Sequence, residues 1–400
     1  MQLSSSPLNP LLVPRRGELF FGASEKTFAE FFAGIGLMRI GLERQGWRVA
    51  YANDIDSGKQ TIYRGHFGQG FEQGDIHTLM ASDVPMVALA TASFPCTDLS
   101  LAGGRLGLQG KQSSALWGFT DLISKMGHRR PPLVLLENVP GFLTSRGGDD
   151  FHQALLRLNA LGYAVDAFIV DAARFVPQSR QRLFVIGVQG EKSSCHAFVV
   201  SDARPAALVD FMRQHDDVRW HLRDLPPLPL GRRSLPEILE DLPPDDPHWW
   251  SESRAAYLLG QMSPRHQAAA AQMMQAEAWS YGTVFRRMRA GKSTAELRTD
   301  GIAGCLRTPK GGSGRQILFQ AGFGRFAVRL ITAREAARLM GADNYVITTP
   351  LNQSLFGFGD AVCVPVVSWI AEHYLNPTWR EWTSLVSLTS AYAKAGVPDA

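Results

Sequence analysis

The chain has 400 residues, of which 45% are hydrophobic and 20% are charged. This composition is typical of a globular protein with room for two or three domains, and it excludes a disordered or fibrous chain. The formal net charge of +4 is too small to indicate a partner by itself. The four cysteines show no Cys-x-x-Cys spacing, so no zinc module or other metal site is expected.

Location is predicted from what the sequence lacks. No run of 18 apolar residues is present, so we expect no membrane span. Prolines and arginines interrupt the first 26 residues, where a signal peptide would need an apolar core. Four cysteines are also too few for a disulfide-stapled secreted scaffold. A reducing cytoplasm is therefore the expected location.

In chain order, the first 190 residues alternate between strand and helix patterns. Strands are expected at residues 28–32, 48–53, 87–94, 133–139, 164–170 and 183–188. Helices are expected from Leu37 onward and over residues 113–126 and 151–161. This alternation predicts an α/β fold with a mostly parallel sheet covered on both faces. In such sheets ligands bind beyond the carboxyl ends of the strands.

The region from about 190 to 328 has a different character. Residues 224–250 contain seven prolines and are expected to be irregular. Residues 281–330 contain ten lysines or arginines against two acidic residues, with glycines interleaved. Such a segment suits a phosphate backbone, although a solvated loop face is the plainer alternative. Residues 360–374 again have helical spacing and could return to the first domain.

Three strand ends carry groups that suit a nucleoside-bearing cofactor. Gly34 and Gly36 follow the first strand and open a helix, where a ligand can approach the backbone. Asp54 ends the second strand, where a carboxylate can accept hydrogen bonds from ribose hydroxyls. Asp75 ends a further short stretch. Each alone could be a turn or a helix cap, and the three together favour the cofactor.

Two other strand ends carry reactive or charged groups. Cys96 follows Pro95 in a glycine-rich loop that includes Ser100, a setting typical of an exposed nucleophile under a mobile cover. Glu137 ends a buried strand, where a carboxylate is costly unless it is paired or functional. Arg180 and Arg182 alternate before the last strand and so share one face, which suggests an anionic or carbonyl-rich substrate.

The combined order of these groups resembles the DNA cytosine-5 methyltransferase family of bacterial type. The resemblance covers residues 27–190 and 328–375. It rests on these motifs: Phe32-Ala33-Gly34-Ile35-Gly36, Asp54, Asp75, Pro95-Cys96, Glu137-Asn138-Val139, Gln178-x-Arg180-x-Arg182, Arg329 to Leu339, and Gly359-Asp360-Ala361-Val362. Two of the departures from the family pattern are Glu30, where Asp is usual, and Asp360, where Asn is usual.

The resemblance implies a Rossmann-like domain that binds S-adenosylmethionine, with an inserted target recognition domain. It divides the chain into an N-terminal extension (1–26), a catalytic domain (27–190), the target recognition domain (191–328), a return segment (329–376) and a tail (377–400). The implied cofactor residues are Phe32, Gly34, Gly36, Asp54, Ile55, Asp75, Ile76, Pro95, Asp360 and Val362. Ser100, Arg286, Arg287, Arg289, Lys310 and Arg315 are expected to contact nucleic acid.

The implied reaction methylates carbon 5 of a cytosine flipped out of duplex DNA. The Cys96 thiolate adds to carbon 6 of the ring, which makes carbon 5 nucleophilic. Glu137 holds ring nitrogen 3 and the amino group, Arg182 holds the ring carbonyl, and Arg180 supports Arg182 and Cys96. The expected partners are double-stranded DNA, bound by a monomer, and a cognate restriction or phage-defence system.

Three alternatives compete with this interpretation. A related enzyme acting on transfer RNA shares the same motifs, although its insert is typically smaller. A DNA-binding module that has lost catalysis is the second, and the intact catalytic residues argue against it. A nicotinamide oxidoreductase is the third, and the missing third glycine after Gly36 argues against it.

Overall fold

The structure is a computed structural model that describes residues 25–95, 114–190, 198–231, 233–289, 291–308 and 314–384. Cys96, Ser100 and Lys310 lie outside the described residues, and only the backbone of Arg289 is described. The expectations for those side chains therefore remain predictions.

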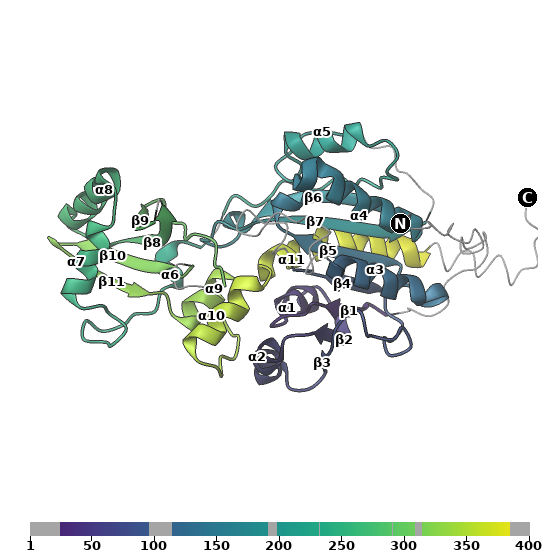
Figure 1. Ribbon diagram of the computed structural model, residues 1–400, viewed down its shortest axis with the longest axis horizontal. Coiled ribbons are helices and arrows are strands. Elements are labelled where there is room, and N and C mark those ends of the chain that lie inside the picture. The colour runs from purple at the N-terminus through teal and green to yellow at the C-terminus, as the bar shows by residue number, and fades with distance from the viewer. Residues whose placement is uncertain are drawn as a thin grey trace, which may run out of the picture.

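A seven-stranded sheet forms the larger part of the protein (Figure 1). Its strand order is β3-β2-β1-β4-β5-β7-β6, and β7 runs antiparallel to both β5 and β6 while the other pairs are parallel. The strands are β1 (Thr27–Phe31), β2 (Arg48–Asp54), β3 (Glu72–Gln73), β4 (Leu89–Ala92), β5 (Leu133–Asn138), β6 (Tyr163–Asp171) and β7 (Gln181–Gln189). The predicted α/β fold with a mixed, mostly parallel sheet is confirmed.

Both faces of this sheet are covered, because successive strand residues point to opposite sides. Leu133 and Leu135 of β5 belong to one buried cluster, and Val134 and Leu136 belong to the other. Helices of the first cluster are α1 (Leu37–Glu43), α9 (Ala333–Leu339), α10 (Leu351–Asp360) and α11 (Val364–Ile370), with one side of α2 (Ser57–Phe67). Helices of the second are α3 (Ser114–Lys125), α4 (Asp149–Ala160) and α5 (Ala206–Gln214).

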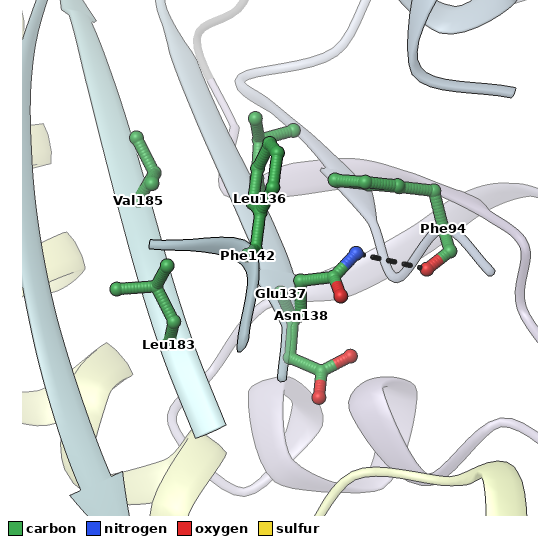
Figure 2. Close-up of a pocket in the computed structure, with 7 residues that line it drawn as sticks. All are labelled: Phe94, Leu136, Glu137, Asn138, Phe142, Leu183 and Val185. Carbon is green, nitrogen blue, oxygen red and sulfur yellow. Dashed lines mark hydrogen bonds between the residues drawn. The ribbon is translucent and has the colours of Figure 1, made fainter. Parts of the chain in front are cut away.

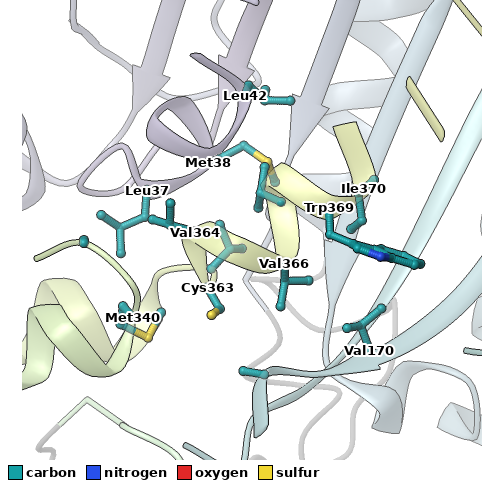
Figure 3. Packing of buried hydrophobic residues seen from close by; sticks show 14 of the residues in the cluster. Leu37, Met38, Leu42, Val170, Met340, Cys363, Val364, Val366, Trp369 and Ile370 are labelled. Atoms are coloured by element: carbon teal, nitrogen blue, oxygen red, sulfur yellow. The ribbon is translucent and has the colours of Figure 1, made fainter. Parts of the chain in front are cut away.

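The C-terminal helices pack against the first helix of the chain. Figure 3 shows Val364 of α11 beside Leu37 and Met38 of α1, while Trp369 points toward Val170 of β6. The contact is close, since a Cβ on Gly41 would lie 2.5 Å from the Val367 side chain. The helical run 351–384 is long and apolar enough to cross a membrane, but 72% of its apolar window is buried in the protein. That burial is typical of a core helix.

A second, four-stranded antiparallel sheet lies apart from the first (Figure 1). Its order is β11-β10-β8-β9, and α7 (Glu252–Gly260) and α8 (Pro264–Gln275) pack on it around a separate core. The strands are β8 (Ser280–Arg289), β9 (Lys292–Arg298), β10 (Ile317–Gly322) and β11 (Arg325–Leu330). The basic, glycine-rich segment is therefore largely sheet rather than open loop.

The boundary expected at residue 190/191 differs from the packing that the structure shows. The core of the large sheet includes Leu208 and Met212 of α5 and the side chain of Trp220. The backbone of Trp220 also forms an isolated β-bridge with Val165 of β6. Ile238 of α6 (Leu235–Ile238) joins the other core of that sheet. The second core begins only at Ala255. Residues 203–239 thus extend the first domain, because their apolar side chains are buried there.

Candidate active site

The loop after β1 has a backbone that few residues tolerate. Phe32, Gly34 and Gly36 all have positive φ angles, of 54°, 58° and 79°. A Cβ on Gly36 would lie 2.4 Å from the Phe67 ring and 2.8 Å from the Tyr63 ring. Glycine is therefore required at residue 36, and the loop presents backbone N–H groups at the start of α1.

Asp54, the last residue of β2, holds this loop in place through hydrogen bonds. Its carboxylate accepts hydrogen bonds from the Gly34 N–H at 2.9 Å and the Asp56 N–H at 3.0 Å. Ile55 beside it is 62% exposed, which is unusual for an isoleucine. A carboxylate held next to a glycine loop, with an exposed apolar side chain beside it, fits a nucleoside with a ribose and a flat base.

Asp75 and Ile76 lie next to this pair. The Asn53 side chain donates to the carbonyls of Glu72 and Gly74, both at 3.0 Å, and so ties the turn before Asp75 to the end of β2. The Asp75 carboxylate accepts the His77 N–H at 3.0 Å, and Ile76 is buried. The residues present therefore fit a nucleoside-bearing cofactor such as S-adenosylmethionine, which the resemblance implies.

Asp360 reaches the same region from the far end of the chain. It is the last residue of α10, and its carboxylate lies 3.1 Å from the Lys59 ammonium of α2. Val362, two residues later, is buried in the core. Asp360 therefore contacts α2 directly. Val362 is part of the same core cluster as Ile62 of α2.

A second group of side chains lies where β5 ends and β7 begins. β5 is the direct neighbour of β4 in the sheet. The Glu137 carboxylate pairs with the Arg182 guanidinium at 2.9 Å, and both side chains are largely buried. The Asn138 side chain donates to the Phe94 carbonyl at 3.2 Å, which ties the end of β5 to the segment that leads to Pro95. Figure 2 shows this bond, with the Glu137 carboxylate pointing away from the apolar side chains that line the neighbouring narrow crevice.

Arg180 occupies a different position from the one expected beside the substrate. Its guanidinium is buried and donates to the Leu306 carbonyl at 3.0 Å, the Gly359 carbonyl at 3.1 Å and the Ala361 carbonyl at 2.5 Å. It also contacts the Cys305 sulfur at 3.3 Å. Arg180 therefore joins three distant stretches of chain, which makes it a positioning residue, while Arg182 alone of the two pairs with Glu137.

Two residues near this site, Glu30 and Lys59, were given no role in the sequence analysis. Glu30 of β1 is buried, and its carboxyl oxygens make no hydrogen bond of good geometry within the described residues. Burial raises the pKa of Glu30 to about 8, against the opposing charge of Arg39. In the sequence, Glu30 lies two residues before Phe32, but no role was assigned to it. Lys59 belongs to no motif, so nothing in the sequence indicates that it adjoins the cofactor loop.

The basic side chains of the second sheet are less uniform than their count suggests. Arg286 and Arg287 are adjacent on β8, so they point to opposite faces, and only Arg287 is well exposed. Arg315 is half-buried. Arg329 is buried and pairs with the buried Glu335. The charge available to a phosphate backbone is therefore smaller than the sequence excess.

The fold and the strand-end groups together define a Rossmann-like, S-adenosylmethionine-dependent methyltransferase domain. The sequence model of the C-5 cytosine-specific DNA methylase family matches residues 26–376. The chain belongs to this family.

Individual relatives agree with that assignment. The type II methyltransferase M.DsaV of Dactylococcopsis salina is 34% identical over 49% of this chain and 56% of its own length. M.NgoBI of Neisseria gonorrhoeae is 26% identical over 84% of this chain and 89% of its own. The chain thus spans about half the length of the first of these relatives. The S. pombe Dnmt2 methyltransferase has the same fold, with a TM-score of 0.59 at 18% identity over 88% of this chain and 99% of that one.

Proposed function

We propose that this protein transfers a methyl group from S-adenosylmethionine to carbon 5 of a cytosine flipped out of duplex DNA. The observation that carries the proposal is the buried Glu137–Arg182 pair, which lies at the strand ends beside Pro95. Cys96 follows Pro95 directly in the sequence, and we propose it as the nucleophile.

The roles of the protein groups follow from their chemistry. The Cys96 thiolate forms a bond to carbon 6 of the ring, and loss of the carbon 5 proton later expels it. Glu137 holds ring nitrogen 3 and the amino group, and Arg182 stabilises the charge that develops on the ring carbonyl. Their mutual pairing fixes both groups before the base arrives. S-adenosylmethionine, when bound, supplies the methyl group.

Flipping the base out of the duplex costs a few kcal/mol of stacking and pairing. Contacts between the protein and the DNA must offset this cost. The exposed Arg287 on the β8–β9 hairpin supports phosphate contacts. We place Arg286, Arg289, Lys310, Arg315 and Ser100 in the same proposed DNA-contacting set. We also propose that one monomer binds each site. The protein would act with a restriction or phage-defence system, as the type II relatives' names suggest.

Methyl transfer to DNA tests the proposal directly. The protein is incubated with labelled S-adenosylmethionine and mixed-sequence duplex DNA, and the methylated positions are mapped by bisulfite sequencing. We expect 5-methylcytosine within a short recurring motif, and no transfer by Cys96→Ala. Labelling of transfer RNA but not of DNA would reassign the substrate. DNA binding without transfer to either nucleic acid would leave a catalytically silent binder.

A further inference from the structure

Lys59 has no assigned role, and its ion pair with Asp360 is the strongest such feature near the candidate active site. We propose that this ion pair sets the charge of the donor site and thereby its selectivity for S-adenosylmethionine over the demethylated product, S-adenosylhomocysteine. The inference rests on the proposed function, because it takes the pocket around Asp54 as the donor site.

The pair bridges two segments that are 300 residues apart in sequence. Lys59 lies in the first turn of α2, and its ammonium is 3.1 Å from the Asp360 carboxylate at the end of α10. A second bond joins the same helices, since the Gln353 side chain donates to the Gly58 carbonyl at 3.4 Å. The pair is therefore one part of a built contact between α2 and α10.

Asp360 is held from its other side as well. The carbonyls of Gly359 and Ala361, which flank it, both accept hydrogen bonds from the buried Arg180. A Cβ on Gly359 would lie 2.6 Å from the backbone of Arg307. The backbone at residue 360 thus has little freedom, and its carboxylate, which is 44% exposed, lies beside Lys59 of α2.

Lys59 is placed among carboxylates. Burial lowers the pKa of Lys59, but the charges of Asp54, Asp360 and Asp56 oppose that effect and raise the pKa overall. Asp54 is the carboxylate that faces the ribose, so Lys59 lies close enough to feel the charge of a bound donor. Three carboxylates and one ammonium leave the site with a negative balance.

The donor and the product differ in one charge. The donor sulfur is a sulfonium cation, and after methyl transfer it becomes a neutral thioether. This sulfur is attached to the ribose through a single carbon, so a donor held at Asp54 brings the cation next to Asp54 and its charged neighbours. A more negative site therefore favours the donor, and a more positive site favours the product.

The two substitutions should change the ratio of the product Kd to the donor Kd in opposite directions. Lys59→Gln removes a positive charge, so the ratio of the product Kd to the donor Kd should rise, by about three- to tenfold at low salt. Asp360→Asn removes a negative charge and should lower the ratio by a similar factor. The double variant should return close to the wild-type ratio, since it restores the net charge.

Calorimetric titration of the DNA-free protein with each compound is the test, because it needs no turnover. Lys292→Gln is the matched control: it removes the same charge from an exposed position on β9, and it should leave the ratio unchanged. Unchanged ratios in both single variants, or equal weakening of both compounds, would overturn the inference. Failure of the wild-type protein to bind either compound would instead contradict the proposed donor.

Discussion

The buried Glu30 predicts a specific dependence of stability on pH. The side chain is 2% exposed and lies on β1, directly before the cofactor loop. The charged or titratable groups that act on it are Arg39 and Glu43 of α1, Tyr63 of α2, Asp54 of β2 and Tyr345. Desolvation outweighs the attraction of Arg39 and raises the pKa of Glu30 to about 8. Folding therefore requires this carboxyl to take up a proton at neutral pH.

The magnitude follows from the difference between the folded and unfolded pKa values. The unfolded value is close to 4.5 and the folded value is about 8. Between these values the folded state binds more protons, so the free energy of unfolding falls as pH rises, by about 1.4 kcal/mol per pH unit. Above the folded pKa the penalty is complete and amounts to about 5 kcal/mol.

Glu30→Gln removes the titrating proton and keeps the shape. We expect the stability of the variant relative to wild type to increase by about 1.4 kcal/mol per unit from about pH 6 to about pH 8, and then to level off. Denaturant unfolding at several pH values measures it. The difference between the proteins is the useful quantity, because other titrating groups, such as His66, whose pKa burial lowers, contribute to both proteins alike.

Glu252→Gln is the control for this experiment. Glu252 is exposed on α7, which packs on the second sheet, and it is not among the groups that act on Glu30. Its substitution should change stability by a constant small amount across the same pH range. A pH-independent difference for Glu30→Gln as well would refute the reasoning, because it would mean that Glu30 is ionised in the folded protein.

Three further predictions concern the candidate active site and the DNA surface. Arg182→Ala leaves the buried Glu137 without its partner, and should lower kcat by at least about a hundredfold while DNA affinity in a gel-shift assay changes little. Asp54→Ala removes the acceptor that fastens the cofactor loop, and should weaken donor binding by tenfold or more in calorimetry with DNA binding near normal. Arg287→Ala should reduce the slope of log affinity against log salt by about one. Unchanged turnover, donor affinity or salt slope, respectively, would contradict each assignment.

Much of the first domain could be predicted from the sequence, for a physical reason. The central strands β1, β4 and β5 are buried on both faces, so they appear as short, mostly apolar runs such as Leu133 to Leu136. Polar residues that end such runs gather at one edge of the sheet. That is why Asp54 and Glu137 could be assigned to the site without a structure.

The second sheet could not be predicted in the same way. β8 contains three arginines and a methionine in its last four residues, so its alternation is hidden by charge. Pairing with β9 and β10, and packing under α8, decide the structure there. Charge counting failed for a related reason: Arg329 counts as basic in sequence but is buried against Glu335.

Arg180 shows what sequence reasoning misses even inside a recognised motif. Its spacing from Arg182 predicted that the two side chains share one face, but Arg182 pairs with Glu137 while the partners of the Arg180 guanidinium lie 125 to 181 residues away. Its guanidinium donates to the Leu306 carbonyl, in the segment between β9 and β10. It also donates to the carbonyls of Gly359 and Ala361, which flank Asp360. Strand and helix patterns depend on residues that are close in the sequence, so contacts over such separations could not be predicted from them.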